Sequence, residues 1–281
     1  MISGKARLAG VMGWPVSHSQ SPRLHGFWLD RYAIDGAYVP LPVEPENFEA
    51  ALRALPKLGF AGVNVTVPHK EAALGLVDEV DPVARQIGAV NTIVVKEDGA
   101  LAGFNTDAFG FMENLLQTCK TPPVLDRPAV VLGAGGAARA VLASLIDFGV
   151  PEIHIVNRTI ERAEALSQSF DGPLRVQDWK NLDQALEGAG LLVNTTSLGM
   201  TGKPPLEISL GTLPTDAVVY DIVYSPLKTS LLEAAEVRGN MTIDGLGMLL
   251  HQARSGFEKW FGTLPEVDDE LRQHVLKGLN G

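Results

Sequence analysis

The sequence predicts an α/β protein of two domains, and three observations lead to this fold class. The chain has 281 residues, and at roughly 150 residues per domain this length favours two domains over one. Short apolar or β-branched runs alternate with segments of helical apolar spacing, in two successive series. A cluster of glycines joins a strand to a helix in the second series. We therefore expect two open, mostly parallel sheets with helices on their faces.

The first series covers the first hundred residues. Its helices are recognised by apolar side chains at helical spacing, such as Leu24, Trp28 and Tyr32. A charged stretch with a glycine, Lys96–Gly99, is typical of a hairpin turn. The predicted strands are Arg7–Met12, Ala37–Leu41, Gly62–Val67 and Val90–Val95, and the predicted helices are Ser21–Ile34 and Asn47–Leu58.

The second series follows a predicted helix over Asp107–Cys119 and a break at Pro122-Pro123. It contains short buried strands, with helices between them. These strands are Pro128–Leu132, Ile153–Val156, Leu191–Asn194 and Ala217–Val223, and a helix of small residues is expected over Ala137–Phe148. Two more helices, Leu246–Phe261 and Val267–Leu279, come last, and their pattern does not say which domain they join.

Composition and charge exclude several classes of protein. Hydrophobic residues make up 46% and charged residues 20% of the chain, a balance typical of globular proteins and not of disordered ones. The formal net charge is −10, so the surface on average repels nucleic acid and anionic membranes. We expect no nucleic-acid or membrane partner, and any phosphate has to be bound by a few placed groups.

Cysteine usage and hydropathy bear on the compartment. Cys119 is the single cysteine, which excludes an intrachain disulfide, fits a reducing compartment and indicates a packing role. Met1–Val16 has no apolar run long enough for a signal peptide. The most apolar long stretch, Pro128–Ile146, is interrupted by Arg139 and clustered glycines, so it indicates a buried strand and helix instead of a membrane span. A cytoplasmic location is predicted.

The glycine cluster carries the strongest chemical signal. It has the form G-x-G-x-x-A, directly after a predicted strand and at the start of a predicted helix. In this form, glycines make a tight turn and let backbone N–H groups approach a pyrophosphate at the helix N-terminus. The segment therefore predicts dinucleotide binding, and its residues are Gly133, Ala134, Gly135, Gly136, Ala137 and Ala138.

The end of the next strand bears on which dinucleotide is bound. An NAD-binding domain places Asp or Glu there, against the ribose 2′-hydroxyl. This chain instead has Asn157, Arg158 and Thr159, with Arg162 one turn later. Guanidinium groups bind a 2′-phosphate that a carboxylate would repel, so NADP is favoured over NAD. The alternative is that both arginines are surface residues paired with Glu161 or Glu164.

Polar residues of the first domain stand where strands end, which is where open α/β sheets bind ligands. Ser19 and Ser21, two apart, could donate to a carboxylate, but on composition alone Ser21 before Pro22 is favoured as a helix cap. Predicted strand ends also lie close to Thr66, Lys70, Asn91 and Asp107. The alternatives are that Lys70 is a solvated residue at a helix start and that Asp107 is a helix cap.

Two other kinds of site lack support. The six histidines show no metal-ligand spacing, and one cysteine cannot form a thiolate site, so no metal is predicted. There is also no G-x-S-x-G elbow of a serine hydrolase.

The ordered motifs resemble those of the shikimate dehydrogenase family, and the resemblance covers nearly the whole chain. In chain order they are Gly13-Trp14-Pro15 through His18-Ser19-Gln20-Ser21-Pro22, Asn64-Val65-Thr66-Val67-Pro68-His69-Lys70, Gly88-Ala89-Val90-Asn91-Thr92, Asn105-Thr106-Asp107, Gly133 to Ala138, Asn157-Arg158-Thr159, Asn194-Thr195-Thr196 through Gly199-Met200, Asp221-Ile222-Val223-Tyr224, and Asp244-Gly245-Leu246-Gly247-Met248-Leu249 with Gln252. The chain departs from the family at His25-Gly26, where His-Asn is usual, which puts only a packing detail in doubt.

The resemblance implies an NADPH-dependent, reversible reduction of 3-dehydroshikimate to shikimate, a step of chorismate and aromatic amino acid biosynthesis. It implies a substrate domain over residues 1–106, rejoined by the C-terminal helices of 238–281, and a Rossmann-like NADP domain over 107–237, with a cleft between them. By the same likeness Lys70 and Asp107 match the family's catalytic pair. The implied substrate contacts are Ser19, Ser21, Thr66, Asn91, Asp107, Tyr224 and Gln252, and the implied contacts on the cofactor side include Thr195, Ile222, Gly245 and Met248.

Hydride addition to a ketone puts negative charge on its oxygen, so a proton donor has to lie near that oxygen. The lysine ammonium of Lys70 serves this role in the hypothesis, with Asp107 orienting it and binding a hydroxyl.

Three alternatives remain. They are a quinate or shikimate dehydrogenase with relaxed substrate or cofactor use, a non-catalytic ligand-binding relative, and a related dehydrogenase of an amino acid or folate. Arg158, Ser19 and Ser21 favour shikimate with NADP, and the presence of Lys70 and Asp107 argues against a non-catalytic protein. The oligomeric state, monomer or homodimer, stays open.

Overall fold

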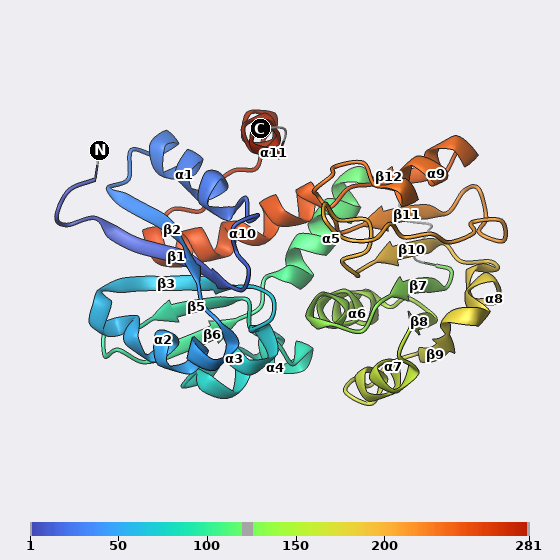
Figure 1. Ribbon diagram of the computed structural model, residues 1–281, viewed down its shortest axis with the longest axis horizontal. Coiled ribbons are helices and arrows are strands. Elements are labelled where there is room, and N and C mark those ends of the chain that lie inside the picture. The colour runs from blue at the N-terminus through green and yellow to red at the C-terminus, as the bar shows by residue number, and fades with distance from the viewer. Residues whose placement is uncertain (1, 120–125, 280–281) are drawn as a thin grey trace. The chain divides into compact units, whose positions relative to one another are not determined.

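The computed structural model describes residues 2–119 and 126–279. The predicted break at Pro122-Pro123 lies outside these residues. The chain forms two compact units, the first made of Met1–Thr106 with Leu250–Gly281 and the second of Asp107–Leu249. Each unit contains one six-stranded sheet with helices packed on it (Figure 1). The predicted α/β class with two domains is confirmed.

The first unit has a mixed sheet of strand order β2-β1-β3-β5-β6-β4. Three of its strand pairs are parallel (β1 with β2, β1 with β3, β4 with β6) and two are antiparallel (β3 with β5, β5 with β6). The turn predicted at Lys96–Gly99 joins β5 to β6, and Lys96 N donates to Ala100 O at 2.9 Å. The strands are β1 Arg7–Gly13, β2 Gly36–Pro42, β3 Phe60–Val65, β4 Glu79–Val80, β5 Thr92–Val95 and β6 Leu101–Phe104.

Helices cover both faces of this sheet. The core against α2, α3 and α4 is mostly aliphatic, with Leu52, Val63 and Ile93 buried in it. The other face carries α1 and α10, with buried aromatic residues at their contact. These helices are α1 Ser21–Arg31, α2 Phe48–Ala54, α3 Lys70–Leu76, α4 Pro82–Ile87, α10 Leu246–Phe261 and α11 Asp269–Leu279, with 3₁₀ turns at Pro45–Asn47 and Pro56–Leu58.

Some predicted boundaries are wrong for local reasons. The helix expected to run to Ile34 ends at Arg31, because Ala33 has a positive φ of 51°. The helix expected over Asn47–Leu58 begins at Phe48 and ends at Ala54, because Pro56 offers no backbone N–H to continue it. The strands expected to end at Val67 and to begin at Val90 instead end at Val65 and begin at Thr92.

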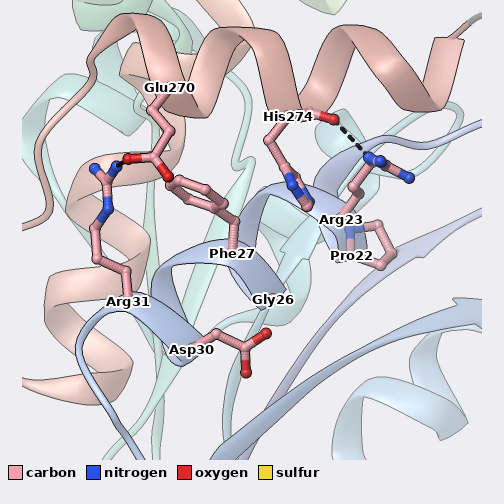
Figure 2. A pocket seen from close by; sticks show the side chains of 8 residues that line it. All are labelled: Pro22, Arg23, Gly26, Phe27, Asp30, Arg31, Glu270 and His274. Atoms are coloured by element: carbon pink, nitrogen blue, oxygen red, sulfur yellow. Dashed lines mark hydrogen bonds and ion pairs between the residues drawn. The ribbon is translucent and has the colours of Figure 1, made fainter.

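The C-terminal helix α11 packs on α1 (Figure 2). Arg31 forms an ion pair with Glu270 at 2.5 Å, and Arg23 Nε donates to the carbonyl oxygen of His274 at 2.7 Å. The ring of Phe27 lies 4.9 Å from that of His274. These contacts, with Trp260 Nε1 donating to Ile93 O at 2.9 Å, attach the end of the chain to the first unit.

The second unit has a fully parallel sheet of strand order β12-β11-β10-β7-β8-β9. Counted from β7, this is the order 3-2-1-4-5-6 of doubly wound dinucleotide-binding folds. Its strands are β7 Ala129–Leu132, β8 Ile153–Asn157, β9 Leu174–Asp178, β10 Leu191–Asn194, β11 Val218–Asp221 and β12 Met241–Ile243. Its helices are α5 Asp107–Thr118, α6 Gly136–Phe148, α7 Ile160–Ser167, α8 Leu182–Leu186 and α9 Ser230–Arg238, with a 3₁₀ turn at Trp179–Asn181.

Successive residues of the central strands enter two different cores. Val131 and Val193 face α5, α6 and α7, while Val130 and Leu192 face α8 and α9. Burial on both faces explains why these strands are continuous apolar runs in the sequence. Cys119 is buried in the first of these cores.

The chain returns to the first unit within α10. The predicted second boundary follows residue 237, whereas the contacts divide the chain after Leu249. One reason is that β12, Met241–Ile243, pairs in parallel with β11 and so belongs to the second sheet. Among the described residues, no helix is both long and apolar enough to cross a membrane.

Candidate active site

The glycine loop connects β7 to α6 at the carboxyl edge of the parallel sheet. Gly133 has φ +110°, and a Cβ there would lie 2.7 Å from Thr195 Oγ1. Thr195 in turn donates through this oxygen to Leu132 O at 2.6 Å. A side chain at position 133 is therefore excluded by both backbone conformation and space.

The outer side of the same loop is open. Gly135 is the N-cap of α6, and a Cβ there would meet nothing within 4 Å. The first helical bond comes from Arg139 N to Gly135 O, so the N–H groups of the first turn remain as donors at the positive end of the helix dipole. A backbone cradle with space before it fits the pyrophosphate of a dinucleotide.

The residues after β8 lie beside this loop. Gly133 N donates to Val156 O at 2.9 Å, and Leu132 is paired with Val156 in the sheet. Asn157 Nδ2 donates to Thr159 O at 2.7 Å and closes the turn into α7, of which Thr159 is the N-cap. Arg158 is exposed, and its guanidinium carbon lies 5.4 Å from the centre of the Trp179 ring.

The alternative for the two arginines was that each is a surface residue paired with Glu161 or Glu164. Arg158 and Arg162 are both exposed. In the described part of the chain, neither forms an ion pair with Glu161 or Glu164. Their guanidinium groups are thus not neutralised by these carboxylates.

The remaining predicted cofactor residues follow the neighbouring strands β10, β11 and β12. Thr195 comes directly after β10 and Ile222 directly after β11. A Cβ on Gly245 would lie 2.0 Å from Ile222 O, so only glycine allows the close approach of these two segments. Met248, on α10, is buried in the same core against which Ile222 packs.

Asn114 of α5 holds the segment around Gly245 and had no predicted role. Its Nδ2 donates to Asp244 O at 3.0 Å and to the Tyr220 hydroxyl at 2.8 Å. Gly247 leaves room for this side chain, since a Cβ there would lie 1.8 Å from Asn114 Oδ1. A buried amide on an apolar helix face is the signal that could have identified it.

In the first unit, Ser19 and Ser21 stand at the start of α1. Ser21 is buried and is the first helical residue instead of the cap, a position taken by Gln20. Ser19 Oγ accepts from Ser21 N at 3.3 Å. The hydroxyl of Ser21 also hydrogen-bonds Tyr38, whose pKa is raised well above its usual value by burial and lowered in part by this bond.

A chain of buried hydrogen bonds leads from Tyr38 across the sheet. The Tyr38 hydroxyl donates to Asn64 Oδ1 at 2.6 Å. Asn64 Nδ2 donates to Thr92 Oγ1 at 3.1 Å, and Thr92 Oγ1 donates to Asn91 Oδ1 at 3.0 Å. The chain therefore connects β2 to the predicted substrate residue Asn91.

The chain continues to Gln252 on α10. Asn91 Nδ2 donates to Thr106 Oγ1 at 3.0 Å and approaches Gln252 Oε1 at 3.5 Å. Thr106 Oγ1 lies 3.3 Å from the same Gln252 oxygen. Ser21, Asn91 and Gln252 of this network were predicted site residues, whereas Tyr38, Asn64, Thr92 and Thr106 were missed. The polar Asn64 inside an apolar strand was the available signal.

Lys70 is the first residue of α3, and its backbone is well anchored. The ring of His69 stacks on Phe48 at 4.2 Å, and His69 Nε2 lies 2.8 Å from Val43 O. Val90 N donates to Lys70 O at 2.9 Å. Thr66, half-buried, precedes this turn, and its N donates to Met12 O at 2.9 Å.

The predicted substrate residues are divided between the units. Asp107 is buried and opens α5, so it belongs to the second unit, as does the half-buried Tyr224 three residues past β11. Each unit thus contains its own subset of the predicted residues, and these lie near strand ends or helix starts except for Gln252, which is inside α10.

Two other features bear on ligand binding. A pocket of about 630 Å³ between α1 and α11 is lined by residues such as Gly26, Phe27 and His274, and none of the predicted site residues lines it (Figure 2). Within residues 2–119 and 126–279, no three His, Cys, Asp or Glu side chains are grouped as metal ligands would be.

Three family models match successive parts of the chain. The model of the "Shikimate dehydrogenase substrate binding domain" matches residues 11–93, "Shikimate / quinate 5-dehydrogenase" matches 116–200, and "Shikimate 5'-dehydrogenase C-terminal domain" matches 245–269. The chain is 62% identical to the shikimate dehydrogenase (NADP(+)) of Paramagnetospirillum magneticum, over 98% of this chain and 100% of that protein.

Two solved structures are similar over nearly the whole chain. Shikimate 5-dehydrogenase from Thermus thermophilus, in complex with NADP(H) and shikimate, has a TM-score of 0.86 and 38% identity, covering 97% of this chain and 99% of that one. Quinate dehydrogenase from Corynebacterium glutamicum, in complex with NAD, has a TM-score of 0.89 and 30% identity, with the same coverage. The resemblance drawn from the sequence motifs is confirmed, and this chain belongs to the shikimate dehydrogenase family.

Proposed function

We propose that the protein is an NADP-dependent shikimate dehydrogenase that reduces 3-dehydroshikimate to shikimate, reversibly, in aromatic amino acid biosynthesis. The observation that carries the proposal is the carboxyl edge of the second sheet. There the open glycine loop after β7 lies beside Arg158 after β8, in a chain 62% identical to a shikimate dehydrogenase (NADP(+)). We place the enzyme in the cytoplasm.

The second unit supplies the proposed cofactor site. The N–H groups of Gly133 to Ala137 bind the pyrophosphate, while Arg158 and Arg162 bind the 2′-phosphate, with Asn157 and Thr159 forming the turn between them. Thr195, Ile222, Gly245 and Met248 line the adenosine and nicotinamide side. When bound, the reduced nicotinamide supplies the hydride. The glycine cradle and the two exposed guanidinium groups support this assignment.

The proposed substrate contacts use the polar groups of both units. Ser19 and Ser21 donate to the substrate carboxylate. The hydroxyl groups of the substrate ring are bound by the side chains of Thr66, Asn91, Asp107, Tyr224 and Gln252. The hydrogen bonds from Asn64 through Thr92 to Asn91 support a fixed orientation of that amide.

Lys70 and Asp107 form the proposed catalytic pair. Lys70 donates a proton to the ketone oxygen as negative charge develops there, and Asp107 orients the ammonium group and accepts a hydrogen bond from a hydroxyl. In the reverse direction Lys70 accepts the proton. The anchored backbone of Lys70 supports this role, because a proton donor has to be held within hydrogen-bond reach of the reacting oxygen.

Use of quinate or NAD is the second candidate, since the quinate dehydrogenase with NAD has a similar fold. Arg158 argues for NADP at the position where a carboxylate would favour NAD. Ser19 and Ser21 argue for shikimate.

The decisive experiment follows the NADPH absorbance after addition of 3-dehydroshikimate, and it is repeated with NADH and with quinate plus either oxidised cofactor. We expect rapid oxidation of NADPH, slower oxidation of NADH, and a loss of the preference in Arg158→Ala. A preference of the unaltered enzyme for NADH would contradict the 2′-phosphate assignment. Near-normal turnover of Lys70→Ala would contradict the proton-donor role.

A further inference from the structure

We propose that Trp179 is a positioning residue that sets the preference for NADP, because its ring supports the guanidinium group of Arg158. The inference rests on the proposed function, in which Arg158 binds the 2′-phosphate. The contact that carries it is the guanidinium carbon of Arg158 lying 5.4 Å from the centre of the Trp179 ring.

The sheet register brings these two residues together. β8 and β9 are parallel neighbours at the edge of the second sheet, with Asn157 paired to Asp178 (Figure 1). Arg158 and Trp179 are therefore the first residues beyond the carboxyl ends of adjacent strands. The glycine loop follows β7, the next strand on the other side of β8.

The indole ring is held by the protein, whereas the guanidinium group is exposed. Trp179 is half-buried and packs against the core beneath α8, which contains Val156 and Leu182. Its backbone opens a 3₁₀ turn in which Asp178 Oδ1 accepts from Lys180 N at 3.0 Å. Lys180 Nζ also lies 3.1 Å from Asp178 Oδ2, so the carboxylate beside the ring has a cationic partner.

A guanidinium group stacked on a ring keeps the N–H donors along its edge available. Its face is attracted to the aromatic quadrupole, while the donors can form paired hydrogen bonds with phosphate oxygens. Fixing the plane before the ligand arrives reduces the conformational entropy that binding would otherwise cost. Trp179 therefore strengthens binding of nucleotides with a 2′-phosphate and has little effect on nucleotides without one.

The test measures dissociation constants by calorimetry on the full chain, with two probes that differ in the 2′-phosphate, adenosine 2′,5′-bisphosphate and adenosine 5′-monophosphate. In Trp179→Leu we expect about fivefold weaker binding of the bisphosphate and unchanged binding of the monophosphate. Trp179→Phe keeps a ring and should retain most of the affinity. In an Arg158→Ala background, Trp179→Leu should have no further effect.

The matched control is Phe27→Leu, since Phe27 lies under Arg31 at 4.5 Å in the first unit. It removes a comparable ring from beneath an arginine and should leave both affinities unchanged. Equal weakening of both probes in Trp179→Leu, or the same effect with Arg158 absent, would overturn the proposal. A loss of bisphosphate affinity in Trp179→Phe as large as that in Trp179→Leu would also overturn it.

A further variant leaves the ring in place, so it decides the matter even if Trp179→Leu is poorly folded. Arg158→Lys keeps the charge but loses the stacked plane, and it should lose most of the preference for the bisphosphate. Wild-type affinity in this variant would overturn the role of stacking. If Arg158→Ala itself binds both probes normally, the proposed 2′-phosphate site fails. An effect of Arg158→Ala without one of Trp179→Leu refutes only this inference.

Discussion

At the scale of single residues, burial shifts the pKa values of His25 and Asp221 into a range that affects stability. His25 is fully buried, its ring stacks on Tyr38 at 4.0 Å, and burial lowers its pKa from 6.5 to about 3. Asp221 is fully buried at the end of β11, and burial raises its pKa from 3.8 to about 6 despite hydrogen bonds from Thr229, Val223 and Asn194. Both groups therefore favour their neutral forms in the folded protein.

His25 makes the first unit sensitive to acid. Below pH 6.5 His25 is protonated in the unfolded chain, whereas in the folded protein it stays neutral down to about pH 3. The contribution of His25 to stability is therefore present above pH 6.5 and is lost as the pH falls towards 3. The loss amounts to about 2 kcal/mol at pH 5. His25→Phe keeps the stacked ring and should flatten this dependence. The measurement is urea unfolding followed by tryptophan fluorescence from pH 7.5 to 4.5, and equal slopes in both proteins would contradict the prediction.

At the scale of elements, β2, β3 and β5 are connected through the side chain of Asn64. Asn64→Leu keeps the size but leaves the Tyr38 and Thr92 hydroxyls without this buried partner, which should lower the free energy of unfolding by about 1–3 kcal/mol. Because Thr92 in turn contacts Asn91, we also expect a higher KM for shikimate and an unchanged Kd for NADP.

The control for Asn64→Leu is Asn240→Leu in the second unit. Asn240 is also buried, and its Nδ2 donates to Pro214 O at 2.8 Å and to Ala217 O at 2.9 Å. It should cost similar stability with no change in KM for shikimate. A KM that rises equally in both variants would show that general destabilisation, and not the position of Asn91, is responsible.

Elements with strong apolar patterns were predicted, and those without them were not. β7 and β10 are buried on both faces and are visible as apolar runs, as is the small-residue helix α6. β9 is an edge strand of five residues that include Arg175 and Gln177, and β4 has two residues, so neither is an apolar run that stands out in the sequence.

In the candidate site, too, some features could be predicted from local sequence patterns and others could not. The glycine loop could be predicted from physical reasoning, because a strand, a tight turn and a helix are adjacent in the sequence. Lys70 and Asp107 could not, because a polar residue at a helix start is equally a cap, and only the family motifs favoured a catalytic role. The network through Asn64 was missed because its partners lie 26 and 28 positions away along the chain.

At the scale of the whole molecule, the chain passes between the units twice. It leaves the first unit after Thr106 and returns after Leu249, inside the continuous helix α10. Each unit has its own sheet and its own hydrophobic core, so each has its own pH dependence of stability. His25 lies in the first unit and Asp221 in the second.

The two units should therefore respond to acid in opposite directions. Asp221 contributes stability that is complete below pH 3.8 and is lost as the pH rises through about 6, whereas the contribution of His25 decreases as the pH falls from 6.5. Between pH 7.5 and pH 5 the second unit gains about 1–2 kcal/mol from Asp221 while the first loses about 2 kcal/mol.

Trp179 is the only one of the four tryptophans in the second unit, so the tryptophan fluorescence of Trp179→Phe follows the first unit alone. At pH 5 the thermal midpoint by fluorescence should fall several degrees below that by far-ultraviolet circular dichroism, and the two should approach each other at pH 7.5. Asp221→Asn should reduce the separation by removing the gain in the second unit, and coincident midpoints at both pH values would contradict this account.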